Sequence, residues 1–177
     1  MDALSEYLNY IDYLPTLVAF FALIQNWKDI NIRWFLILGL TVGVIDNYSM
    51  QYAIHWTTHF YAWAIFVNLL LIVPVVFRKQ IAHKIYNLTG FNFFYEATKY
   101  KFSQHEAAIV LICFISIIGH GISYVEVFLY KSYIIDVLYF KSFVLGKLQL
   151  ILHILSTFVI LSLSFKLKGL NYEANRV

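Results

Sequence analysis

The stretch from residue 107 to residue 127, AAIVLICFISIIGHGISYVEV, constrains the fold more than any other part of the chain. A helix of about 20 apolar residues, at a rise of about 1.5 Å per residue, crosses the ~30 Å hydrocarbon core of a bilayer. A run this long and continuous favours a helix over a strand. Backbone groups in lipid must also satisfy one another, as they do in a helix. The stretch therefore predicts a transmembrane helix.

Further apolar runs predict an all-α, polytopic integral membrane protein with about five transmembrane helices. Hydrophobic residues make up 61% of the 177-residue chain, whereas soluble domains average about 45–50%. A soluble domain of this size cannot bury so much apolar surface, so lipid must supply the remaining cover. We expect one transmembrane domain, residues 1–177, with spans at about 9–27, 34–53, 60–77, 107–127 and 148–165.

The first of these spans is the weakest, since its strongly apolar part, Leu14 to Trp27, reaches only about 21 Å. Two connecting segments mix apolar and charged residues in the manner of helices that lie on a membrane surface. Residues 78–106 predict one or two such helices on the inner side, broken near Gly90, and residues 129–147 predict one on the outer side. We expect Glu126, near the outer boundary, to need no specific partner.

The lysines and arginines predict an orientation, because cytoplasmic loops carry an excess of both residue types. With the N-terminus outside and the C-terminus in the cytoplasm, all but three of the 13 lysines and arginines lie inside. The exceptions are Lys131, Lys141 and Lys147. The expected location is a membrane crossed several times, most simply a bacterial inner membrane.

Ionisable residues fall within three of the predicted spans. Asp46, His120 and His153 lie about 18–20 Å from the predicted inner boundary of their helices. Ionisable groups in a membrane usually face the bundle interior and pair with one another. We expect an intramembrane polar cluster formed by Asp46, Asn47, Asn68, His120, Ser123 and His153. Such a cluster serves either as a proton or ion relay or as a structural hydrogen-bonded contact between helices.

Small residues predict two faces of close helix packing. Gly39 and Gly43 have the spacing that allows two helix backbones to approach closely. Ser116, Gly119, Ser123 and Glu126 share one face of the central span, which either lines a hydrated path or packs against another helix.

The histidines suggest two weaker cofactor hypotheses. His55 and His59, if they share a helix face, have a spacing that suits zinc. His120 and His153 are candidate axial ligands of a haem. The only cysteine, Cys113, excludes a disulfide within the chain. We identify no catalytic motif, expect no nucleic-acid partner because the basic residues are dispersed, and favour a protein without a cofactor.

Three classes of function remain open. The first is a small membrane-embedded subunit that oligomerises or docks a partner, as a channel, sensor or scaffold, for example in a bacterial defence or immunity system. Its basic, aromatic segment 78–106 would meet a cytoplasmic protein or anionic lipid. The second is a proton- or ion-coupled transporter that uses Asp46, His120 and His153. The third is a membrane cytochrome or metalloenzyme that uses the histidines.

Overall fold

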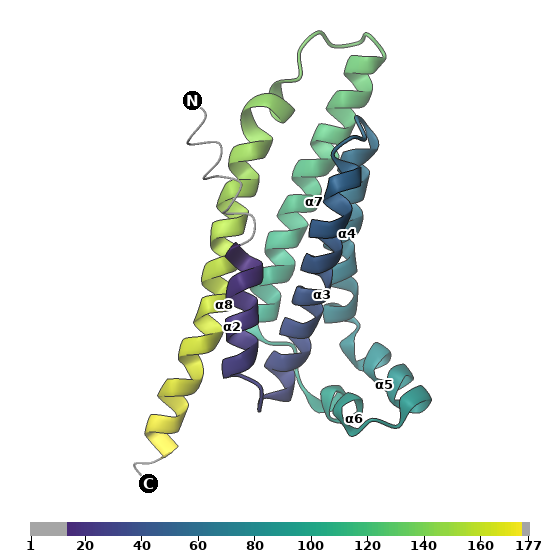
Figure 1. Ribbon diagram of the computed structural model, residues 1–177. Coiled ribbons are helices and arrows are strands. Elements are labelled where there is room, and N and C mark those ends of the chain that lie inside the picture. Colours follow the sequence, from purple (N-terminus) through teal and green to yellow (C-terminus); the bar gives the residue numbers. More distant parts are fainter. Residues whose placement is uncertain (1–13, 175–177) are drawn as a thin grey trace.

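The computed structural model describes residues 14–174, with side chains to residue 163, and all regular secondary structure in this part of the chain is helical (Figure 1). A π-helix, η1 (Phe140–Leu145), runs directly into the last α-helix. The α-helices are α2 (Leu14–Gln25), α3 (Ile30–Ala53), α4 (His59–Val76), α5 (Arg78–Thr89), α6 (Asn92–Lys99), α7 (Gln104–Lys131) and α8 (Gly146–Ala174).

Four of the helical segments are long and apolar enough to cross a membrane. They are α3, α4, α7 and the continuous segment Phe140–Leu163 formed by η1 and α8. Only 17% to 33% of their most apolar windows is buried inside the protein. Most of their apolar side chains thus face outward, which is stable when the solvent is lipid. The prediction of an all-helical chain is confirmed for the described residues, and these helices indicate a membrane protein.

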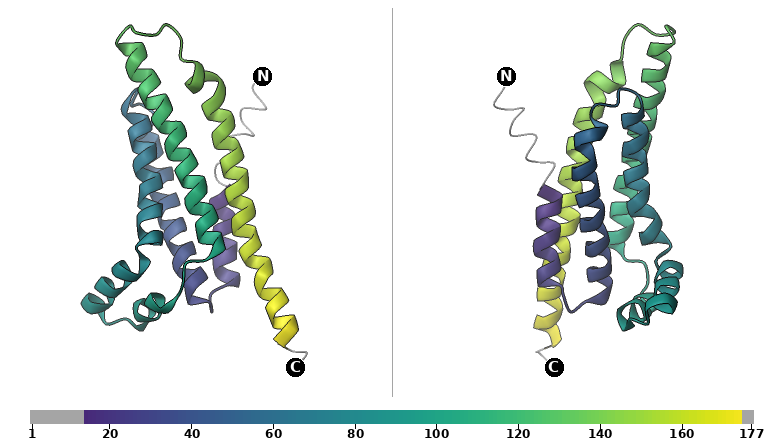
Figure 2. Two further views of the ribbon diagram at one scale, coloured as in Figure 1. Left: turned by 180° about the vertical axis from the view of Figure 1, so that it is seen from behind. Right: turned by 45° about the vertical axis from the view of Figure 1, so that its right-hand side comes forward.

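The long helices stand side by side, and their neighbours follow a closed order, α2–α3–α4–α7–α8, with α8 returning to α2 (Figures 1 and 2). The helices α5 and α6 lie at one end and turn aside from the bundle. We call these two helices the platform, and we call that end of the bundle the platform end. The opposite end carries the turn from α3 to α4 and the connection from α7 to α8.

The helix α2 is shorter than the span predicted at 9–27. Its 12 residues extend about 18 Å, and it does not qualify as a membrane-crossing helix by length. Residues 9–13 of the predicted span lie outside the described residues. The helix packs between α3 and α8 and buries Ala19, Ala22 and Leu23.

The platform matches the segment predicted at 78–106. The predicted break is confirmed at Gly90, whose φ of 69° is a left-handed conformation that glycine adopts without steric cost. Its N–H donates to the Tyr86 carbonyl oxygen at 2.8 Å and so ends α5. The platform packs on α3 through Trp34, Ala82 and Ala97, which are all buried.

The prediction of a surface helix at 129–147 is wrong. Instead, α7 continues to Lys131, an irregular connection follows, and η1 extends α8 toward the opposite end. Tyr133, with a φ of 57°, lies just after the end of α7. The physical reason lies in Glu126, whose carboxylate accepts hydrogen bonds from the Phe140 and Lys141 N–H groups at 2.7 and 2.8 Å. These bonds hold the first turn of η1 against α7, in line with α8.

Candidate functional site

A buried ion pair joins the platform to the bundle. The Arg78 guanidinium donates from Nη1 to Glu106 Oε1 at 2.6 Å, and the two side chains are only 4% and 2% exposed. Arg78 begins α5, and Glu106 lies in the first turn of α7. The pair therefore fixes where the chain leaves the bundle for the platform and where it returns.

Further hydrogen bonds surround this pair. Arg78 Nη1 also donates to the Asn31 side-chain oxygen on α3, and Nη2 donates to the Lys101 carbonyl oxygen at 3.1 Å. Glu106 Oε2 accepts from the Ser103 N–H at 2.7 Å, and the Glu106 N–H donates to Ser103 Oγ at 3.2 Å. This reciprocal capping box satisfies N-terminal donors of α7. We call the four side chains of Asn31, Arg78, Ser103 and Glu106 the junction.

The junction is the best-connected polar site among the described residues, and the sequence prediction missed it. A buried ion pair is costly to desolvate and is held by its additional hydrogen bonds. The signal that identifies half of it is the pattern Ser103-x-x-Glu106 directly before an apolar run, which is typical of a capping box. Nothing in the sequence identifies Arg78, rather than a neighbouring cation, as the partner of Glu106.

A second polar site lies between α4, α7 and α8. Asn68 Nδ2 donates to the Ala64 carbonyl oxygen at 2.8 Å and lies 3.4 Å from Ser116 Oγ. The Ser116 hydroxyl donates to Gln149 Oε1 at 3.2 Å. Asn68 and Ser116 were predicted as a polar and a packing residue, whereas Gln149 was not singled out. The structure thus connects three helices through one chain of side chains.

His120 and Ser123 lie farther along the same face of α7. Ser123 is fully buried and His120 is 8% exposed. The imidazole of His120 lies against the rings of Phe60 and Tyr61, with centroids 6.4 and 6.2 Å away. Neither His120 Nδ1 nor Ser123 Oγ has a hydrogen-bond partner among the described residues. The polar face of α7 is therefore turned toward the bundle interior rather than toward lipid.

The packing register sets the relation between His120 and His153. Because Ser116 contacts Gln149 and the two helices run antiparallel, His120 lies one turn from that contact toward the opposite end and His153 one turn toward the platform end. Their Cα atoms are then about 12 Å apart along the bundle axis. Side chains lean toward the N-terminus of their own helix, so these two lean toward each other.

The remaining two members of the predicted cluster lie on a different helix. Asp46 and Asn47 belong to α3, which packs mainly on α2 and α4 rather than on α7 or α8. The side chain of Asp46 is exposed and that of Asn47 is half-buried. Both α3 and α7 pack on α4.

The predicted packing glycines differ in their surroundings. A Cβ added to Gly119 would lie 2.8 Å from Leu148 Cδ2, so this glycine allows α7 and α8 to approach closely. A Cβ on Gly43 would lie 3.1 Å from Thr16 Oγ1, which places Gly43 against α2. A Cβ on Gly39 would meet no atom within 4 Å. Gly43 thus serves a contact within the chain, and Gly39 faces open space.

The histidine-based cofactor sites receive no support. The expectation that His55 and His59 share a helix face is wrong, because α3 ends at Ala53 and α4 begins at His59. No group of three or more metal-ligating side chains occurs among the described residues. The Phe60 and Tyr61 rings pack on the His120 imidazole.

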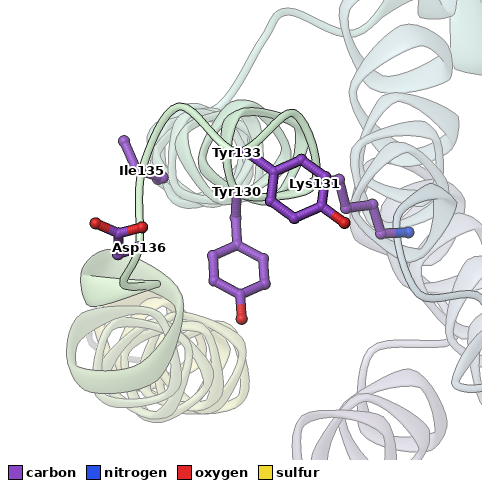
Figure 3. A pocket seen from close by; sticks show the side chains of 5 residues that line it. All are labelled: Tyr130, Lys131, Tyr133, Ile135 and Asp136. Atoms are coloured by element: carbon purple, nitrogen blue, oxygen red, sulfur yellow. The ribbon is translucent and has the colours of Figure 1, made fainter.

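A shallow hollow of about 390 Å³ lies at the opposite end of the bundle (Figure 3). Its polar side chains diverge: Lys131 points toward α4, away from Asp136. The Lys131 ammonium donates to Thr57 Oγ1 at 2.8 Å and also contacts Thr58, so it joins the end of α7 to the turn between α3 and α4. The residues that line the hollow are Tyr130, Lys131, Tyr133, Ile135 and Asp136.

Comparison with protein-family models, curated proteins and solved structures finds no match to this chain.

Proposed function

We propose that the protein is a membrane-embedded scaffold subunit that holds the platform in a fixed orientation at the cytoplasmic face of a bacterial inner membrane. In this proposal the chain crosses the membrane five times, with its N-terminus outside and its C-terminus inside. The distribution of lysine and arginine supports this orientation. We further propose that it works as an assembly, either of several copies or with another membrane protein.

The observation that carries the proposal is the junction. A platform joined to the bundle by a flexible linker would need no buried ion pair, whereas this one is held at both of its ends. Arg78 and Glu106 lie 28 residues apart in the chain, and the intervening segment contains both platform helices. The packing of Ala82 and Ala97 on Trp34 provides a third attachment, to α3. A rigid, basic, aromatic surface at the end of a helix bundle suits a scaffold better than it suits catalysis.

The fixed platform is tested by the distance between two spin labels. The labels replace Asn87 on α5 and Val44 on α3, both exposed, in a Cys113→Ala background. Double electron–electron resonance should give one narrow distance distribution. Glu106→Gln should broaden it, while Glu96→Gln, which removes a partner from an exposed pair, should leave it narrow. A broad distribution in the otherwise unchanged protein contradicts the proposal.

A second candidate, the proton- or ion-coupled transporter, is favoured by one observation, the buried polar face of α7. It predicts a pH-dependent flux into proteoliposomes that His120→Gln abolishes. The matched control is His83→Gln, on the exposed side of the platform. Absence of flux with the unaltered protein removes this candidate.

A further inference from the structure

The position of the platform limits what its exposed face can meet. The apolar helix α4 ends at Val76, and α5 begins only two residues later at Arg78. Where α4 ends at the membrane boundary, the first turn of α5 therefore lies at headgroup depth. Both platform helices then turn aside from the bundle (Figures 1 and 2). This path keeps the platform along the membrane surface rather than directed away from it.

The exposed face of the platform is positively charged. Lys79, Lys84 and Lys101 are exposed and belong to no ion pair among the described residues. Glu96 is the only acidic residue between 78 and 105, and Lys99 Nζ lies 2.6 Å from its carboxylate. The hydrogen bond to Glu96 raises the pKa of Lys99, so this pair stays ionised and neutral overall. Among the described residues, the platform thus presents Lys79 and Lys84, and the connection after it presents Lys101, without an ion-pair partner.

Apolar side chains lie next to these charges. Leu88 and Phe91, which flank Gly90 at the turn of the platform, are 85% and 65% exposed. Phe93 and Phe94, by contrast, are turned inward against Trp34. Exposed apolar residues beside lysines at headgroup depth are the pattern of helices that lie within the membrane interface. A soluble anion would neutralise the lysines but would leave Leu88 and Phe91 in water.

We infer that the exposed face of the platform binds anionic phospholipids of the adjacent leaflet. Lys79, Lys84 and Lys101 contact the phosphate groups, and Leu88 and Phe91 insert among the upper acyl carbons. The inference deepens the proposed function, on which it rests for the cytoplasmic position of the platform. It names a lipid, rather than a soluble protein, as the partner of this surface.

Lipid selectivity tests the charge. The protein is reconstituted in phosphatidylcholine with a trace of spin-labelled phosphatidylglycerol or spin-labelled phosphatidylcholine, and the fraction of immobilised label is measured. The protein should prefer phosphatidylglycerol, and Lys79→Gln with Lys84→Gln should weaken that preference about tenfold or more. Lys141→Gln with Lys147→Gln removes the same charge from the opposite end and should leave it intact. Equal selectivity in both double variants overturns the inference.

The depth of a spin label in the membrane tests the insertion of the apolar side chains. A nitroxide at Leu88→Cys, in a Cys113→Ala background, should be more accessible to oxygen than to a water-soluble nickel chelate. A nitroxide at Tyr133→Cys, which replaces a side chain 95% exposed at the opposite end, supplies a surface reference. A Leu88 label as accessible to nickel as the Tyr133 label overturns the inference.

Different results contradict the rigid scaffold and the lipid inference. Loss of phosphatidylglycerol preference with a narrow spin-label distance contradicts only the lipid inference, and a broad distance with retained preference contradicts only the rigid scaffold.

Discussion

Replacing Glu106 by glutamine should destabilise the protein strongly. The variant leaves the Arg78 guanidinium buried without its counter-charge, and loss of one partner of a buried pair costs about 3–5 kcal/mol. Denaturant unfolding in a mild detergent measures this change. The control is Glu96→Gln, whose pair with Lys99 is exposed, so its loss should change the stability little. If the two variants lose equal stability, the junction does not hold the platform as described.

The double variant Arg78→Met with Glu106→Leu separates packing from charge. Apolar replacement of both partners removes the desolvation penalty, so this double variant should be more stable than a variant that loses only one of the two charges. The same unfolding measurement applies. A double variant that is less stable than Glu106→Gln would indicate that the hydrogen bonds to Asn31 and Lys101 outweigh the cost of burying the charges.

Gly119 and Gly121 make a matched pair on α7. A methyl group at Gly119 would lie 2.8 Å from Leu148 Cδ2, so Gly119→Ala forces α7 and α8 apart or displaces Leu148, at a cost of about 1–3 kcal/mol. Gly121 has open space, so Gly121→Ala should be neutral or should stabilise the helix by up to about 1 kcal/mol. Thermal unfolding of both variants checks the sign. A destabilising Gly121→Ala would place another protein surface at that position.

At the scale of the elements, the side chain of Glu126 holds the first turn of η1. Glu126→Gln should release the first turn of η1, because an ionised carboxylate holds the Phe140 and Lys141 N–H groups. Hydrogen bonds to a charged group contribute about 1.5–3 kcal/mol each. Hydrogen–deuterium exchange of residues 140–145 should therefore accelerate while exchange in α4 is unchanged. Unaltered exchange in η1 would mean that α8 alone orders this turn.

The positions of the long apolar helices could be predicted from hydropathy, because each is apolar over its whole length. Their ends could not, because local contacts set them. Asp29 caps α3 by accepting hydrogen bonds from the Asn31 and Ile32 N–H groups, so that α3 begins at Ile30, four residues before the predicted start of that span. In the same way, the hydrogen bond from the Phe140 N–H to Glu126 holds η1 as an extension of α8, where a surface helix at 129–147 was predicted.

The candidate site was predictable only in part. A spacing along α7 reveals that Ser116, Gly119 and Ser123 share a face, since helical periodicity is local. Which helices meet that face depends on tertiary packing, and the structure puts α4 and α8 there rather than α3. Equal depth in three spans thus could not decide which of Asp46, His120 and His153 lie in contact. The choice of Arg78 as the partner of Glu106 is likewise a long-range property of the fold.

The topology of the entire chain remains a prediction with a direct test. Reporter fusions at Arg33, His83 and residue 177 should report the cytoplasmic side, and a fusion at Thr57 should report the outside, as the excess of lysine and arginine requires. Native mass spectrometry from a mild detergent should then give a multimer or a complex of defined stoichiometry. A periplasmic C-terminus contradicts the five-span arrangement, and a monomer contradicts the proposed assembly.

The Arg78–Glu106 bond also dictates an order of events during synthesis. Its two halves leave the ribosome 28 residues apart, with both platform helices between them. Until Glu106 has been synthesised, the Arg78 guanidinium lacks its counter-charge, so the ion pair cannot yet hold the segment that follows α4. During biogenesis the platform should therefore reach its fixed position only after the first turn of α7 has been made, before η1 and α8 are added.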